Sequence, residues 1–69
     1  MPLTLATTGI ENSIKRINGR DEAKRFLENL GFVVGGAVTV VSENAGNVIV
    51  NVKNTRIAIS REMANRIQV

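Results

Sequence analysis

The stretch Asp21–Gly36, DEAKRFLENLGFVVGG, decides the fold because it is the only segment with a clear helical repeat. Its apolar residues follow the spacing i, i+3, i+4 and i+7, which forms one stripe on a helix: Ala23, Phe26, Leu27 and Leu30. We therefore predict a helix over about 21–30. A helix this short cannot bury its stripe alone, so the rest of the chain must supply the surface on which it lies.

Both ends of this helix carry terminal signals. Asp21 is expected to cap the first turn, because its carboxylate can accept hydrogen bonds from free backbone N–H groups. Gly31 is expected to end the helix in a left-handed conformation. Phe32 would then pack back on Leu27, as in a Schellman motif.

Two valine-rich runs after the helix, 37–43 and 47–52, predict a β-hairpin. The two valine faces coincide when the loop between the runs has three residues, which pairs Val40 with Val50. Gly46 would then be the left-handed residue of a turn with a G1 bulge.

The two ends of the chain are expected to meet. Ile14 and Ile17 stand three residues apart, so a strand through this region should bend or carry a bulge. A last strand over 67–69 would pair with this first strand. The sequence thus predicts a mainly β fold, a small, partly open, five-stranded barrel with one inserted helix.

Between the hairpin and the last strand, the chain shows a tight turn at 53–55 and an alternating strand at 56–59 with Ile57 and Ile59 inward. Ser60 is suited to cap a short helical turn over 61–64.

Composition limits what the chain can do. Its 69 residues are expected to form a single domain, 1–69. Because the chain has no Cys and no His, neither a disulfide nor a zinc site of the usual kind can stabilise it, and aliphatic packing must do so. No apolar run approaches the roughly 18 residues that span a membrane. The net charge of +3 comes from scattered bases, which is typical of a solvated surface.

The side chains of common active sites are missing. Without His, Cys or Tyr, the usual nucleophile–base pairs and His-based acid–base schemes are excluded. Asp21 and Glu22 are explained by their place at a helix start. The glycines at 31, 35 and 36 follow a helix instead of preceding one, so they do not form a phosphate loop. We predict a protein that is not an enzyme, holds no cofactor and has no tight Fe(II) or Zn(II) site.

Surface residues that could meet a partner fall into three pairs. Two pairs are apolar and are expected outside the core, although exposed aliphatic side chains often have no role and the chain's own terminus could cover them. A basic pair on the outer side of the helix would steer an acidic partner. The candidates are Val41 and Ile49 across the hairpin, Phe32 and Val34 after the helix, and Lys24 and Arg25 on the helix.

The order of these features resembles the FeoA family, the small ferrous iron transport proteins A. The most telling parts are the Leu-x-x-Leu-Gly-Phe-x-x-Gly run over 27–35 and the closing Ala64-x-x-Ile67-x-Val69, and the resemblance spans nearly the whole chain. It implies an SH3-like barrel with an inserted helix. It also implies a cytosolic bacterial protein that supports Fe(II) uptake by contacting the cytoplasmic part of FeoB, a membrane GTPase transporter, at the inner face of the membrane.

A second function remains open from the residues themselves, because small basic barrels often bind nucleic acid or act in regulation. Proteins that bind single strands stack bases on aromatic side chains, and this chain has only Phe26 and Phe32. The accessory role is therefore the leading interpretation, and a nucleic-acid-binding or regulatory module is the alternative.

Overall fold

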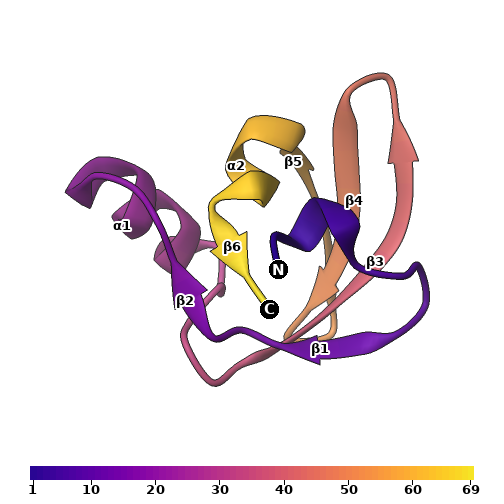
Figure 1. The fold of residues 1–69 in the computed structure, drawn as a ribbon, viewed down its shortest axis with the longest axis horizontal. Coiled ribbons are helices and arrows are strands. Elements are labelled where there is room, and N and C mark those ends of the chain that lie inside the picture. Colours follow the sequence, from indigo (N-terminus) through magenta and orange to yellow (C-terminus); the bar gives the residue numbers. More distant parts are fainter.

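The computed structural model describes residues 1–69 as a mainly β molecule with two short α-helices (Figure 1). In chain order the elements are the 3-10 turn η1 (Leu3–Leu5), β1 (Glu11–Ser13), β2 (Arg16–Ile17), α1 (Asp21–Asn29), β3 (Ala37–Asn44), β4 (Asn47–Val52), β5 (Thr55–Ser60), α2 (Arg61–Asn65) and β6 (Ile67–Gln68). Neither α-helix is long and apolar enough to cross a membrane.

The strands form two sheets. One has four strands in the order β1-β3-β4-β5, and the other pairs β2 with β6; every pairing is antiparallel. The predicted five-stranded barrel therefore appears as six strands, because the first predicted strand is divided into β1 and β2.

The division falls where the chain passes from one sheet to the other. Ile14 lies between the two strands, its N–H donates to the Gly36 carbonyl at 2.8 Å, and the N–H of Lys15 donates to the Gln68 carbonyl at 2.7 Å. Ile14 and Ile17 are both buried. The expected bend in this strand is confirmed, and it lets both isoleucines reach one core.

The β3–β4 hairpin has the predicted pairing at its base but a different loop. Val40 pairs with Val50 as expected. The loop has two residues, Ala45 and Gly46, with φ of 51° and 83°, which are the positive angles of a type I′ turn. The prediction of a three-residue loop was wrong. With a two-residue loop, the two valine faces coincide only if one strand holds an extra residue, and the bulge at Val41 supplies it.

The next turn and the second helix agree closely with the sequence. Lys53 and Asn54, both at positive φ, connect β4 to β5. The Ser60 hydroxyl accepts from the N–H of Met63 at 3.2 Å and caps α2, as predicted. The helix runs one residue beyond the predicted turn, to Asn65.

Helix α1 begins and ends for different reasons. Arg20 occupies the N-cap position without a side-chain hydrogen bond, so the capping role expected of Asp21 was wrong; Asp21 is the first helical residue, where its charge still favours the helix dipole. The C-terminus is the predicted Schellman motif. The N–H of Phe32 donates to the Leu27 carbonyl and that of Gly31 to the Glu28 carbonyl, both at 3.0 Å, with Gly31 at φ 107°.

A single core joins these elements. The two termini meet beside it, since the Val69 N–H donates to the Met1 carbonyl at 2.8 Å. All of the core side chains are apolar: Leu3, Ile14, Ile17, Leu27, Phe32, Val38, Val40, Val48, Val50, Val52, Ile59, Ala64, Ile67 and Val69.

Candidate interaction surface

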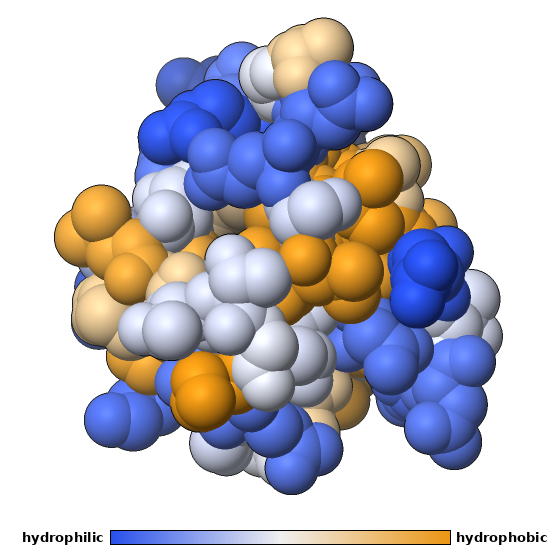
Figure 2. Space-filling view, turned by 90° about the vertical axis from the view of Figure 1, so that its right-hand side faces the viewer, coloured by the Kyte–Doolittle hydropathy of each residue, from blue (hydrophilic) through white to orange (hydrophobic).

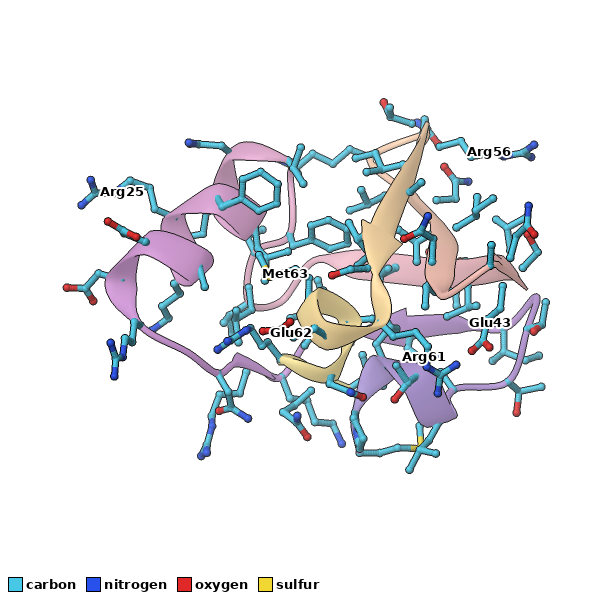
Figure 3. The ribbon with its side chains drawn as sticks, turned by 90° about the horizontal axis from the view of Figure 1, so that it is seen from above. Arg25, Glu43, Arg56, Arg61, Glu62 and Met63 are labelled. Carbon is cyan, nitrogen blue, oxygen red and sulfur yellow. The ribbon has the colours of Figure 1, made fainter.

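Helix α1 projects from the sheets and carries one basic candidate pair (Figure 1). Leu27 is its only fully buried side chain, while Lys24 and Arg25 are exposed. Figure 3 shows Arg25 pointing away from the body of the molecule. The two bases are thus placed where they can meet a partner without rearrangement.

The segment after α1 holds one buried and one exposed candidate. Phe32 has no exposed surface, so the expectation that it lies in a surface patch was wrong. The Schellman motif explains this, because it turns the residue after Gly31 back toward Leu27. Val34 is 64% exposed. The loop that carries it is held by the Gly35 N–H, which donates to the Ile14 carbonyl at 2.8 Å.

The outer face of the hairpin holds the other apolar pair. Val41 and Ile49 are half-buried, and the neighbours of Ile49, Val48 and Val50, are fully buried on the opposite face. Because Val41 is the bulged residue, Ile49 pairs with Ser42 and does not face Val41 directly as predicted. Figure 2, which views the side that carries the hairpin, shows separate apolar areas between hydrophilic ones.

Two ion pairs lie on the surface, and neither involves a candidate residue. Arg61 contacts Glu43 at 2.8 Å and Arg66 contacts Glu62 at 3.6 Å, with side chains that remain partly exposed. Figure 3 shows the Arg61 and Glu43 side chains beside each other. Such exposed pairs contribute little to stability.

No group of three acidic side chains comes together that could hold a metal ion. The surface has two open hollows. One is lined by Glu11, Asn12, Ser13, Gly35 and Ala37, and the other by Arg20, Asp21 and Glu22. None of the six candidate residues lines either hollow, so a contact through the candidates would lie outside them.

Sequence reasoning missed several exposed apolar side chains. Phe26 is 50% exposed although it belongs to the apolar stripe of α1, and Leu5 and Ile10 are exposed as well. The exposure of Phe26 could have been expected from the shortness of the helix. A helix of nine residues that projects from the sheets can bury only one side of its apolar stripe.

A comparison with models of protein families shows to which family this chain belongs. The model described as "FeoA domain" matches residues 1–69 of this chain. The chain belongs to the FeoA family. Membership in it implies an accessory role in ferrous iron transport.

Individual proteins of the FeoA family are similar to this chain in sequence and in structure. A protein of Methanocaldococcus jannaschii named "Putative Fe(2+) transport protein A" is 34% identical over 68 residues, which covers 99% of this chain and 83% of that protein. The crystal structure of an iron uptake regulatory protein (FeoA) is 29% identical, with a TM-score of 0.86 over 96% of this chain and 88% of its own. FeoA of Stenotrophomonas maltophilia, complexed with zinc and described as a prokaryotic SH3 domain protein, is 27% identical, with a TM-score of 0.85 over 100% of this chain and 88% of its own.

These matches confirm the predicted SH3-like fold. A manganese-dependent transcriptional repressor shares it at a TM-score of 0.87, with 17% identity, 97% of this chain and 39% of the repressor covered. At that identity the likeness concerns the fold alone.

Proposed function

We propose that this FeoA chain is a non-enzymatic accessory protein of ferrous iron uptake that binds the cytoplasmic part of a FeoB-type membrane GTPase transporter. The observation that carries the proposal is the family match over residues 1–69, which includes every element of the fold. In this proposal the chain works as one domain in the cytoplasm and reaches the inner face of the membrane through its partner.

The side chains present support action by contact. The chain has no His, Cys or Tyr for acid–base or nucleophilic catalysis, and its surface hollows hold none of the exposed apolar or basic candidates. What the surface offers is half-buried or exposed apolar side chains on the hairpin and after α1, and exposed bases on α1. These are the usual components of a protein-binding face.

The exposed candidates offer two alternative apolar anchors. Val41 and Ile49 on the sheet would anchor one face, or exposed Val34 after α1 would anchor the other. Lys24 and Arg25 are exposed, and neither forms an ion pair. They would attract an acidic partner and raise the association rate.

Calorimetric titration with the purified cytoplasmic domain of the transporter tests this proposal. We expect one-to-one binding that weakens as salt is raised, because exposed charges are screened. Replacing Lys24 and Arg25 with Gln should reduce that salt dependence. A titration without heat, together with no shift in sedimentation at any salt concentration, would contradict the proposal.

The alternative, a nucleic-acid-binding module, has less physical support. Phe32 is fully buried, so Phe26 is the only aromatic ring available for stacking on a base. Scattered bases alone give only weak, salt-sensitive binding to nucleic acid.

A further inference from the structure

The four-stranded sheet has one long free edge. Strand β5 pairs with β4 on one side and with no strand on the other. All six of its residues, Thr55–Ser60, are in continuous register with β4. A strand in this position presents a row of backbone groups that an additional strand can use.

The geometry of the β4–β5 turn identifies those groups. In a hairpin with a two-residue turn, the residues that flank the turn form a hydrogen-bonded pair, which here is Val52 with Thr55. Hydrogen-bonded and non-hydrogen-bonded pairs then alternate. The N–H and C=O groups of Arg56 and Ala58 therefore point to the free edge, and neither residue takes part in any hydrogen bond outside the sheet.

The other sheet edges are protected in ways that β5 is not. Strand β1 has only three residues, and the part of β3 beyond it is distorted by the bulge at Val41. The strands of the small sheet have two residues each. Short strands and bulges are the common means of blocking strand addition. β5 has neither, and it has no proline.

The side chains along β5 indicate what kind of strand fits. On the outer face, Ala58 pairs with Ile49, so the candidate hairpin face continues to the free edge. Arg56, also exposed on this face, has no ion pair, and Figure 3 shows it extending away from the sheet. On the inner face Ile57 is only half-buried. It packs at the margin of the core, as do Leu30 and Met63.

We propose that β5 accepts an extended segment of the partner protein in which acidic residues alternate with apolar ones. The outward residues would meet Arg56, and the inward residues would cover Ile57. The backbone groups of Arg56 and Ala58 would pair with the segment. This inference rests on the proposed function, since it takes the cytoplasmic part of the transporter as the source of the segment.

A second copy of the chain fits this edge less well. Joining two β5 strands would bring the unpaired Arg56 side chains of both copies to the same seam, with no acidic residue on either strand to balance them. The net charge of +3 on each copy adds to the repulsion.

The test uses the purified cytoplasmic domain of the transporter and two substitutions at one position. Ala58→Pro removes the outward N–H and is tolerated in an edge strand because that group has no partner in the free chain. Ala58→Thr keeps the N–H and serves as the matched control. We expect Ala58→Pro to weaken binding at least about tenfold and Ala58→Thr to change it less than about threefold.

Hydrogen exchange on the wild-type chain provides a readout that needs no variant. The amides of Arg56 and Ala58 should exchange quickly in the free chain and be protected in the complex.

A charge reversal tests the acidic character of the segment. Arg56→Glu should weaken binding, because it would repel the acidic residues of the segment. Equal binding by Ala58→Pro and wild type, unprotected Arg56 and Ala58 amides in the complex, or self-association of the free chain through β5 would overturn the edge proposal. Failure of the wild-type chain to bind would instead overturn the proposed function and remove the basis for the edge proposal.

Discussion

At the scale of single residues, Leu27 is the main attachment of α1. It is the only fully buried side chain of that helix. Leu27→Ala should therefore lower the free energy of unfolding by about 2–5 kcal/mol, through lost burial and the cavity left behind. Phe26→Ala, at a half-exposed neighbouring position, is the control and should cost much less. Chemical denaturation of both variants measures this, and equal losses would show that α1 is packed differently.

Single residues also show why part of the surface could not be predicted from the sequence. Phe32 and Val34 look alike in a linear reading, since both follow the helix and both are apolar. The three-dimensional path of the Schellman motif separates them: Phe32 is fully buried and Val34 is largely exposed. The motif and the return of Phe32 toward Leu27 were predicted, but the complete burial of Phe32 depends on where the sheets lie.

At the scale of elements, the cap of α2 can be tested directly. Ser60→Ala removes the hydroxyl that accepts from the Met63 N–H. We expect a loss of about 1 kcal/mol in the free energy of unfolding. Ser42→Ala is the control, because Ser42 lies exposed in a strand and its side chain makes no hydrogen bond. If the two variants melt at the same temperature, the cap does not stabilise α2.

For the β3–β4 hairpin, the sequence predicted the strands and their pairing but not the length of the loop. Alternating valines correctly placed both strands and the pairing of Val40 with Val50. The same parity argument required one extra residue and assigned it to the loop. The structure places that residue in the strand, as a bulge at Val41, because Ala45 and Gly46 both adopt positive φ and close a two-residue turn. The alternation of side chains between the two faces shows that the hairpin needs one extra residue, but not whether that residue lies in the loop or in a strand.

At the scale of the whole molecule, the sheet face is the first candidate for partner contact. Replacing Val41 and Ile49 with Thr keeps the strand propensity and removes apolar surface, so the fold should survive. We expect binding of the transporter's cytoplasmic domain to weaken about threefold to tenfold, as for half-buried anchors at an interface. A folded double variant that binds as tightly as wild type would exclude this face and leave Val34 with the basic side of α1.

The metal chemistry of the isolated chain gives a separate prediction. Without Cys or His and without a cluster of acidic side chains, we expect no stoichiometric micromolar binding of Fe(II) or Zn(II) at physiological salt. Anaerobic calorimetric titration of the wild-type chain measures this. A salt-resistant, one-to-one isotherm would contradict the prediction and show that carboxylates and backbone oxygens suffice for a site.

The whole-molecule fold was largely accessible from sequence, while the free edge was not. Strand positions, the two helices and the meeting of the termini follow from local patterns and from the need to bury each apolar face. Which strand ends the sheet depends on how the chain divides at Ile14 between two sheets. Local periodicity contains no such information, so β5 could be recognised as an open edge only in the folded molecule.

The accessory role in iron uptake can be measured as uptake of radiolabelled ferrous iron in cells that make the transporter but lack the gene for this chain. We expect uptake to be low in these cells and the wild-type chain to restore it. We also expect a folded Val41→Thr, Ile49→Thr variant to restore less uptake at equal abundance. Uptake that is the same with and without the chain, in cells shown to contain active transporter, would contradict the proposed accessory role.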